Sequence, residues 1–415
     1  MNKKRLFTQS VVAVAITMAS QQALAAGFQL NAQSATGLGR AFAGDAVIAD
    51  NASAMARNAA AMSLFDAPAM SLGINVIDTD IQVKNIQYKA GPVTAPLGDE
   101  QIGDTSYAPN FYYIHPINDK WAVGAGVYSN FGTKTEFSDS FMANEFGGTT
   151  DVKSVNFALS TSYRINEEWS VGGGLDVIYG HGKLKRTNKN IEALIEGQSQ
   201  GTLKGPLADV DADGFAFGWN LGTVYEYNEN NRFGLSYRYS PELEAEGDMH
   251  YQLGGGNISS EKLKMPLPDM AEFSGFHKLN DKFAIHYSVQ WIGWSEFDKL
   301  ETTGGNELNS YKWQDGWHYA IGGTYYLNKD WTLRTGYMYD TSAQDEVTSI
   351  SVPDSDRQWF SGGFTYHIDS KSNIDVGVTY LLGEDVNVVE TKLTSVKATT
   401  RANAWLYGIQ YSRSF

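Results

Sequence analysis

The sequence predicts an all-β protein: a transmembrane antiparallel β-barrel of about fourteen strands, with an amino-terminal hatch (plug) inside its lumen. Three observations predict this fold. The stretch from Trp405 to Phe415 alternates large apolar residues with small or polar ones and ends on an aromatic residue. Similar strands recur from Ala69 onward between short polar turns, and an export signal precedes them. Because successive side chains of a strand point to opposite faces, each such strand has an apolar and a polar face.

The amino terminus has the three parts of a secretory signal peptide. Residues 3–5 are positive, Val11 to Ala19 is apolar, and Ala23-Leu24-Ala25 is a small-x-small cleavage site. We therefore expect residues 1–25 to be removed, with cleavage before Ala26. A single anchoring helix is the alternative, but the apolar run is too short to span a bilayer. No later run reaches roughly 18 apolar residues, so a mature chain that lies in a membrane must be a closed barrel.

The composition agrees with an exported barrel. Aromatic residues make up 13% of the chain and there are 42 glycines, as expected for aromatic girdles at two membrane interfaces and for turns and kinks in curved strands. The net charge of −15 excludes nucleic acid as a partner, because binding it requires a basic surface. Acidic loops outside a bacterial cell are expected to meet divalent cations beside lipopolysaccharide. The absence of cysteine permits any compartment.

From Ala69 to the carboxy terminus, the chain is expected to form the barrel, residues 69–415. Short polar turns separate the strands at one end, and long polar segments such as Thr187 to Asp211 separate them at the other, as in outer-membrane barrels. Asn and Asp suit these turns because their side chains bond the local backbone. One strand before and one after six strand pairs gives about fourteen strands. The six turns are Asn118-Asp119-Lys120, Asn166-Glu167-Glu168, Asn228 to Asn231, Asn280-Asp281-Lys282, Asn328-Lys329-Asp330 and Asp369 to Asn373.

Residues 26–68 are rich in alanine and do not have the pattern of a strand. They precede the first strand and so begin on the periplasmic side. The lumen is the natural place to bury them, as a plug. A disordered tail is the alternative, although the segment is apolar rather than charged. An open general porin is a second alternative, which this block argues against.

Several stretches resemble a known family. The segment AGFQLNAQSATGLGRAFAGDAVIADNASAMARNAAAM, from Ala26 to Met62, closely resembles the amino terminus of the FadL family of outer-membrane long-chain fatty acid transporters. Further matching stretches are Ser129-Asn130-Phe131-Gly132, Ile285-His286-Tyr287-Ser288, Trp294-Ser295-Glu296-Phe297 and Val352-Pro353-Asp354-Ser355-Asp356-Arg357. The resemblance implies a fourteen-stranded barrel with a small hatch in the bacterial outer membrane. It also implies passive uptake of long-chain fatty acids, with capture in an apolar pocket and lateral release at a kink in the third strand.

The resemblance also assigns site residues. Ala26, Gly27 and Phe28 match the pocket-facing amino terminus, and Arg186 matches the pocket arginine. Lys312 is the nearest match to the pocket lysine, in a loop of different length. A fatty acid needs an apolar cleft with a cation at its end, and arginine can bond both carboxylate oxygens. The alternative for Arg186 is a lumen or loop charge in an ion pair.

The kink is expected at Asn130, Phe131 and Gly132. A packing glycine in a curved strand is the alternative for Gly132. The family's Asn-Pro-Ala hatch motif appears as Asn58-Ala59-Ala60, without its proline. We expect Asn58 to bond the unpaired strand backbone at the kink.

Other functions are weaker interpretations. Uptake of other hydrophobic compounds, such as aromatic hydrocarbons, is the runner-up within the family. His286 and Ser288, two apart on one strand, raise the alternative of an outer-membrane lipase, but no third member is apparent, so we expect no enzyme. Gly37-Leu38-Gly39 is no dinucleotide fingerprint, and no cluster has metal-ligand spacing, so neither cofactor nor metal is expected. The protein is expected to be a monomer inserted by the barrel-assembly machinery.

Overall fold

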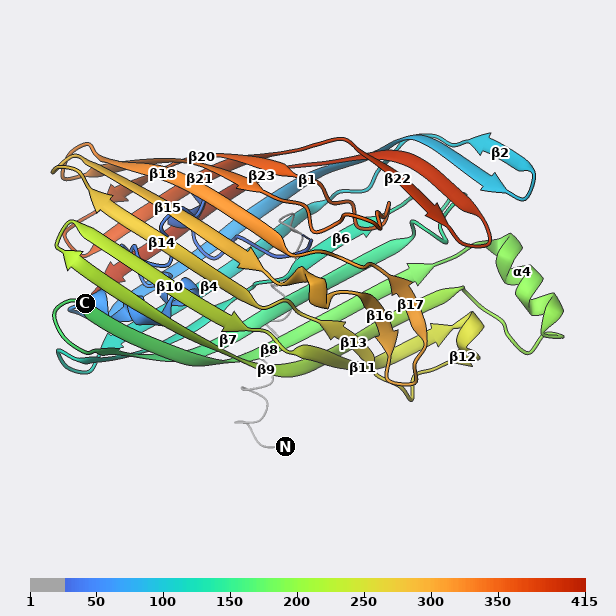
Figure 1. Ribbon diagram of the computed structural model, residues 1–415, viewed down its shortest axis with the longest axis horizontal. Coiled ribbons are helices and arrows are strands. Elements are labelled where there is room, and N and C mark those ends of the chain that lie inside the picture. Colours follow the sequence, from blue (N-terminus) through green and yellow to red (C-terminus); the bar gives the residue numbers. More distant parts are fainter. Residues whose placement is uncertain (1–26) are drawn as a thin grey trace.

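The computed structural model describes residues 27–415 and shows a closed antiparallel barrel (Figure 1). Fourteen strands form the wall, each paired with its two neighbours. The predicted all-β barrel fold is therefore confirmed. The fourteen wall strands are β1 (Ala69–Ala90), β4 (Thr105–Pro116), β5 (Trp121–Tyr128), β7 (Thr149–Arg164), β8 (Trp169–Arg186), β9 (Ala208–Asn228), β10 (Asn231–Tyr239), β14 (Met270–Lys278), β15 (Phe283–Ile292), β18 (Gly316–Tyr326), β19 (Trp331–Asp340), β20 (Arg357–His367), β21 (Ser372–Gly383) and β23 (Ser395–Ser414).

The first and last strands close the barrel. Their register runs from Ala69 opposite Ser414 to Lys89 opposite Ser395, with one shift between Lys84 and Gln87. The closed seam has no strand edge with unpaired backbone groups. A membrane-spanning sheet must be closed in this way, because the bilayer core has no water to bond such groups. The alternation read from the last strand holds: Trp405 and Ile409 face outward, while Leu406 is buried in the lumen.

The six turns expected at one end are all present, and an asparagine organises most of them. The Asn118 side chain accepts hydrogen bonds from the backbone N–H groups of Lys120 and Trp121, at 2.9 and 3.0 Å. Asn166, Asn280 and Asn328 make the same pair of bonds in their turns. Short turns mark this end as periplasmic, and it also holds the carboxy terminus (Figure 1).

The opposite end of the barrel carries the long loops and their small elements (Figure 1). Helix α4 projects furthest at this end, and its first turn is capped by the Asn188 side chain, which accepts from the backbone of Asn190 and Ile191. These elements are β2 (Val93–Pro96), β3 (Glu100–Gln101), β6 (Gly132–Glu136), α4 (Lys189–Gln198), β11 (Glu242–Tyr251), η2 (Gln252–Gly254), β12 (Gly256–Asn257), β13 (Leu263–Pro266), η3 (Trp294–Glu296), β16 (Lys299–Thr302), β17 (Glu307–Ser310) and β22 (Val386–Thr391).

The outer face of the barrel is apolar. Phe217, Leu175 and Leu159 are 74%, 70% and 69% exposed. A soluble protein rarely leaves so continuous an apolar surface open, whereas lipid covers it. Aromatic pairs between neighbouring strands mark the periplasmic rim, with ring centres 4.6–4.9 Å apart; they are Trp121–Tyr163, Trp169–Tyr225, Phe283–Tyr325 and Trp331–Tyr366. The expected aromatic girdle is thus present at this end.

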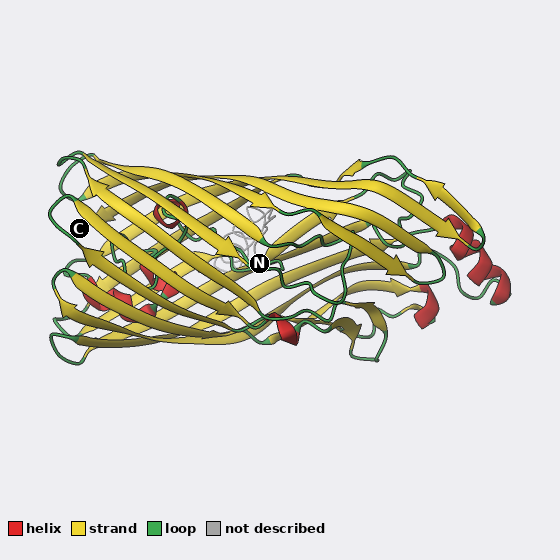
Figure 2. Cartoon of the chain, turned by 45° about the horizontal axis from the view of Figure 1, so that its top comes forward, coloured by secondary structure: helices red, strands yellow, loops and turns green. Residues whose placement is uncertain are grey.

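Residues 27–68, here called the hatch, lie inside the barrel (Figure 2). They contain three short helices, α2 (Ala35–Leu38), α3 (Ala54–Arg57) and η1 (Ala59–Leu64). Glycines in the wall let the hatch backbone approach closely: a Cβ on Gly336 would lie 2.1 Å from the carbonyl oxygen of Arg40, and one on Gly172 would lie 2.5 Å from the nitrogen of Ala60. The small residues that gave this segment its unusual composition therefore fit it against the wall.

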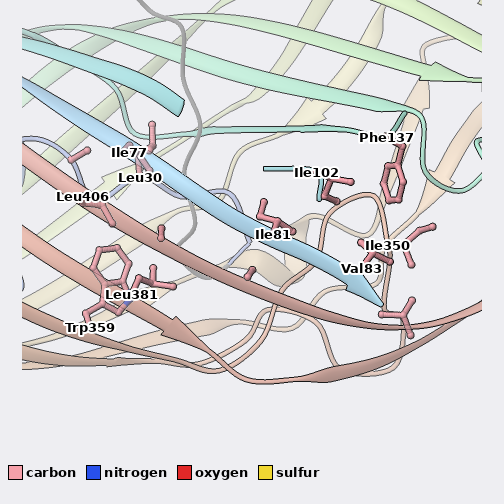
Figure 3. Close-up of a cluster of buried hydrophobic side chains, with 14 of the residues drawn as sticks. Leu30, Ile77, Ile81, Val83, Ile102, Phe137, Ile350, Trp359, Leu381 and Leu406 are labelled. Atoms are coloured by element: carbon pink, nitrogen blue, oxygen red, sulfur yellow. The ribbon is translucent and has the colours of Figure 1, made fainter. Parts of the chain in front are cut away.

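A buried apolar cluster joins the hatch to the wall and continues toward the loops (Figure 3). Leu30 of the hatch packs in the same cluster as Ile77 of β1 and Leu406 of β23. Ion pairs add to this contact, since Arg40 binds Asp45 and Asp50 within the hatch, and Arg334 of β19 reaches Asp50 at 3.2 Å. The hatch is thus held by both apolar packing and buried charge.

Two expectations lie outside the described residues: the signal peptide, residues 1–25, and the mature terminus Ala26. Among residues 27–415, no helix combines the length and hydrophobicity needed to cross a bilayer.

Candidate functional site: an apolar cavity beside a break in the barrel wall

An apolar cavity lies in the outer half of the barrel, where the start of the hatch meets the wall. About 530 Å³ of space lies between its lining atoms, its mouth included. Most of the lining is aliphatic or aromatic, and few polar groups reach it. The lining residues are Phe28, Thr133, Thr150, Val152, Gly182, Lys183, Leu184, Leu263, Met265, Leu267, Phe297, Leu300, Tyr311, Trp313 and Val352. This apolar lining suits a hydrocarbon chain.

Phe28 closes the cavity from the hatch side. Its ring lies 4.5 Å from that of Trp294, 5.1 Å from Phe297 and 5.7 Å from Trp313, mostly edge to face. Aromatic rings favour this geometry because the positive edge of one ring meets the negative face of another. Phe28 therefore lines this cavity from the hatch.

Gly27 fixes the direction in which the chain enters this aromatic cluster. Its φ of +62° is left-handed, and a Cβ here would lie 2.5 Å from the Trp313 ring, so only glycine fits. Its N–H donates to the Asp354 carboxylate at 3.3 Å. Arg357 donates to the same carboxylate at 2.6 Å, which holds the loop after β19 against the hatch.

Arg186 lies at the loop end of β8, next to cavity residues Leu184 and Thr150. Its guanidinium donates to the backbone oxygens of Thr149 and Lys185, at 2.7 and 2.9 Å, and to the Thr150 hydroxyl at 2.8 Å. All three acceptors are neutral, and Arg186 makes no ion pair with the described residues. A buried cation held by neutral groups retains its capacity to bind an anion.

Lys312 does not fulfil its expected role as the second cation. Its neighbours Tyr311 and Trp313 line the cavity, whereas Lys312 itself is exposed and takes no part in the lining. The residue between two inward side chains points away from the cavity.

Lys392 is a better candidate for a second cation. It lies in the turn between β22 and β23, with its Nζ 5.8 Å from the centre of the Phe146 ring. Its side chain reaches solvent, but partial burial of the ammonium among the loops, and after that the charge of Arg186, lower the pKa of Lys392. The loop between β6 and β7, which contains Phe146, also contacts the end of the Arg186 strand, since the Thr187 N–H donates to the Asn144 oxygen at 3.3 Å.

The wall is interrupted beside this cavity. Strand β5 pairs with β7 as far as Tyr128 opposite Asn156, and β6 resumes at Gly132 opposite Lys153. Residues 129–131 lie between the two ladders. On the other side, β4 pairs with β5 only from Phe111 onward, so Thr105 to Asn110 have ladder partners only on β1. The described chain thus has an opening in the wall between β4 and β6, which we call the strand break.

The hatch fills the inner side of the strand break. Gln29 and Phe131 form an isolated antiparallel bridge: the Leu30 N–H donates to the Asn130 oxygen at 2.6 Å, and the Gly132 N–H donates to the Phe28 oxygen at 2.9 Å. The Gln33 side chain donates to the Ser129 oxygen at 3.3 Å and to the Asn130 side chain at 3.1 Å. Backbone groups that would be unpaired in lipid are therefore satisfied by the hatch.

The expectation that Asn58 bonds the backbone at the strand break is wrong. Its side chain donates to the oxygens of Ala46 and Thr223, at 2.8 and 3.0 Å, and accepts from the Ala60 N–H at 3.0 Å. Asn58 thus ties the hatch to β9 and begins η1, even without the family's proline. Gln33 has the role expected of Asn58. Gln33 lies within the stretch that resembles the family, but its position in the sequence does not indicate that it bonds Ser129 and Asn130.

Two of the stretches that resemble the family also supply residues to the site. Trp294 and Phe297 belong to the matching stretch at η3, and Asp354 belongs to the stretch after β19; all three meet the hatch start. Their side chains come from distant parts of the chain, so only the fold brings them together.

The residues considered for a lipase do not form a catalytic pair. The Ser288 hydroxyl lies 3.1 Å from the Glu272 carboxylate and accepts from the Gly44 N–H at 2.8 Å, while His286 meets the Thr324 hydroxyl at 3.1 Å. Within residues 27–415, no group of three or more His, Asp or Glu side chains is placed to hold a metal ion.

Comparisons with known proteins agree with this architecture. Residues 16–415 match the family model "Outer membrane protein transport protein (OMPP1/FadL/TodX)". The chain is 35% identical to the "Long-chain fatty acid transport protein" of Escherichia coli (strain K12), with all of both chains covered. It is also 35% identical to "Outer membrane protein P1" of Haemophilus influenzae, with 99% of each covered.

Solved structures show the same fold. The crystal structure of a Pseudomonas aeruginosa FadL homologue superposes with a TM-score of 0.83 at 21% identity, covering 94% of this chain and all of that one. A toluene transporter, TodX of Pseudomonas putida, superposes with a TM-score of 0.63 over 88% of this chain and 94% of that one. The protein is therefore a barrel of the bacterial outer membrane, and it belongs to the OMPP1/FadL/TodX family of outer membrane transport proteins.

Proposed function

We propose that the protein takes up long-chain fatty acids across the outer membrane, passively and selectively. The observation that carries the proposal is the apolar cavity closed by Phe28, with the unpaired cation Arg186 beside it. A fatty acid has one long apolar tail and one carboxylate, and this arrangement complements both parts. The full-length relatives named as long-chain fatty acid transport proteins support the same substrate class.

The Arg186 guanidinium is the group we assign to the carboxylate, with Lys392 adding positive charge at the loop end. Phe28, Trp313 and Leu184 are assigned to the tail. Lys312 receives no role, because its side chain is turned to solvent.

We assign the strand break as the exit. Each methylene of the tail gains roughly 0.8 kcal/mol by leaving water for an apolar phase. A route that ended in the periplasm would hydrate the whole tail, whereas a lateral exit into the bilayer never does. The hatch bridge at Gln29 and Phe131 closes this exit in the described state.

Uptake of aromatic hydrocarbons is the second candidate. The fold of the toluene transporter is shared, and an apolar cavity would also hold such a ligand. The cation at the cavity favours an acid over a neutral hydrocarbon, because a buried charge without a partner costs free energy. The hatch fills the lumen, which disfavours a general porin. Ser288 and His286 bond other residues rather than each other, which disfavours an enzyme built on this pair.

Growth on oleate, in a host that lacks its own transporter, tests the proposal. Expression of the protein should restore growth and uptake of labelled oleate, and purified protein should bind oleate more tightly than an alkane of the same length. Uptake of toluene without uptake of oleate would assign the protein to the hydrocarbon branch instead.

Further partners follow from the location. Membrane lipid should cover the apolar belt, lipopolysaccharide should surround the loops, and the barrel-assembly machinery should insert the chain as a monomer. Chromatography of the purified protein in detergent, with its mass measured by light scattering, tests the monomeric state.

A further inference from the structure

A second, polar cavity lies on the inner side of the strand break. About 320 Å³ of space lies between its lining atoms, its mouth included. It is bounded by the hatch on one side and by the wall strands β10, β14 and β15 on the other. The lining residues are Gln29, Gln33, Ala56, Arg57, Asn130, Ser236, Arg238, Met270, Glu272 and Gln290. Polar side chains dominate it, in contrast to the apolar cavity nearby.

One extended segment of the hatch separates the two cavities. Phe28 lines the apolar cavity and Gln29 lines the polar one. Successive side chains of an extended chain point to opposite sides, and the bridge from Gln29 to Phe131 fixes this segment in that conformation. The backbone that closes the strand break is therefore also the partition between the two cavities.

Three polar atoms at the polar cavity have no hydrogen-bond partner among residues 27–415: Asn130 Nδ2, Arg57 Nε and Gln29 Oε1. Their side chains are all deeply buried, at 3%, 7% and 1% exposure. Buried polar groups are normally paired, and each unpaired one costs free energy. Asn130 Nδ2 and Gln29 Oε1 thus remain free beside the strand break. Arg57 Nε also makes no hydrogen bond with the described residues, although the Asp45 carboxylate lies 4.0 Å from it.

We propose that this polar cavity is a transit site for the carboxyl group of the ligand during lateral release. Arg57 Nε and Asn130 Nδ2 donate to the carboxyl oxygens while the tail passes through the strand break into the bilayer. This inference rests on the proposed function and adds to it a second, separate headgroup site. In this proposal the ligand's carboxyl group moves from Arg186 to Arg57, which lie on opposite sides of the Phe28–Leu30 segment.

The charges around the polar cavity suit a brief stay rather than tight binding. Arg57 is paired with Glu272 at 3.3 Å and with Asp45 at 4.0 Å, and Arg238 is paired with Asp176. The positive charge is therefore largely compensated, so an incoming carboxylate gains hydrogen bonds but little net attraction. A site from which the ligand must leave for the membrane needs this moderate affinity.

Asn130→Asp is the direct test. The variant retains the oxygen that accepts from Gln33 and so keeps the hatch bond to the strand break. It replaces the free donor by a carboxylate oxygen, which repels the ligand's own carboxylate. We expect oleate uptake to slow about tenfold, the loss typical of one charge-assisted hydrogen bond. Uptake of oleyl alcohol, which has the same tail and no charge, should be unchanged.

Ser236→Asp provides a second variant that leaves the strand break and the hatch intact. Ser236 lines the polar cavity from β10. A carboxylate added there should also slow the uptake of oleate and leave the uptake of oleyl alcohol unchanged. Asn156→Asp is the matched control. Asn156 lies on β7 opposite Tyr128, is fully buried, and does not line the polar cavity. Its substitution should therefore change the uptake of oleate and of oleyl alcohol to the same extent.

Surface expression and oleate binding to purified protein are measured for every variant. Slower oleate uptake with normal oleate binding and normal alcohol uptake, in either cavity variant, supports the transit site. Equal effects on both ligands, or no effect in both cavity variants, overturn it and leave the cavity as a site for water. If the unmodified protein neither binds nor imports oleate, the proposed function itself fails, which is a distinguishable result.

Discussion

The backbones of Gln29 and Phe131 pair as a single antiparallel bridge, although about a hundred residues separate them along the chain. The bridge places the start of the hatch where β4 has no pairing with β6. It therefore occupies the edge that a complete wall would have covered with another strand. Movement of the hatch start would both open the apolar cavity at Phe28 and expose the strand break.

Removal of the hatch should open the barrel to ions. Deletion of Gly27 to Ala60 empties the lumen between the wall strands, because these residues are almost all buried there. Conductance of the purified deletion protein in planar bilayers should rise well above that of the intact protein. A conductance that stays low would show that the hatch is not what blocks the lumen.

Arg186→Ala should weaken oleate binding by about tenfold or more, since a hydrogen bond to a charged group typically contributes about 1.5–3 kcal/mol. Binding of an alkane of similar length should change little. Equilibrium binding to purified protein measures both affinities. If both ligands lose affinity equally, Arg186 acts through packing with Thr149 and Thr150 rather than through its charge.

Lys392→Ala and Lys312→Ala form a contrasting pair. Lys392 lies close enough to Arg186 for the two charges to interact. Its loss removes positive charge from the site, so oleate affinity should fall severalfold, and more at low salt because the site is partly exposed. Loss of Lys312, an exposed residue with no cavity contact, should leave affinity unchanged. A larger effect at Lys312 would restore the family's assignment and remove Lys392 from the site.

Gly27→Val should displace the start of the hatch. A Cβ at this position collides with Trp313 and Trp294, and the left-handed backbone is unfavourable for valine. We expect weaker oleate binding with the barrel still folded, as judged by heat-modified mobility on gels. Gly98→Val is the control, because nothing lies within 4 Å of a Cβ there. Normal binding by the Gly27 variant would mean that the aromatic cluster tolerates a shifted hatch.

Local chemistry in the sequence was sufficient for the barrel. The turn at Asn118 and the alternation around Trp405 depend only on residues close together in the sequence. A short stretch of sequence is therefore enough to predict them. The composition of residues 27–68 likewise reflects their burial against glycines such as Gly336. These features could be predicted because each depends on short-range geometry.

The site depended on contacts between distant segments. The partners of Asn58 and Gln33 lie on β9 and at the strand break, and no spacing within the hatch distinguishes them. Lys312 was misplaced because sequence position alone did not show that its neighbours Tyr311 and Trp313 are the residues that face the cavity. Lys392 was missed because it lies near the Arg186 strand only in the folded loops, where it meets the loop at Phe146.

Lateral release is the central claim, and reversible closure of the strand break tests it most directly. The chain has no cysteine, so Ala108→Cys on β4 together with Gly132→Cys on β6 gives the only two thiols for a cleavable bifunctional cross-linker. Each single substitution is the control for modification alone. Oleate uptake by cells and oleate binding by purified protein are measured before cross-linking, after it, and after cleavage of the linker. The account predicts that cross-linking stops uptake, leaves binding intact, and that cleavage restores uptake. Undiminished uptake by the fully cross-linked protein would contradict it, and would mean that the ligand leaves past the hatch into the periplasm.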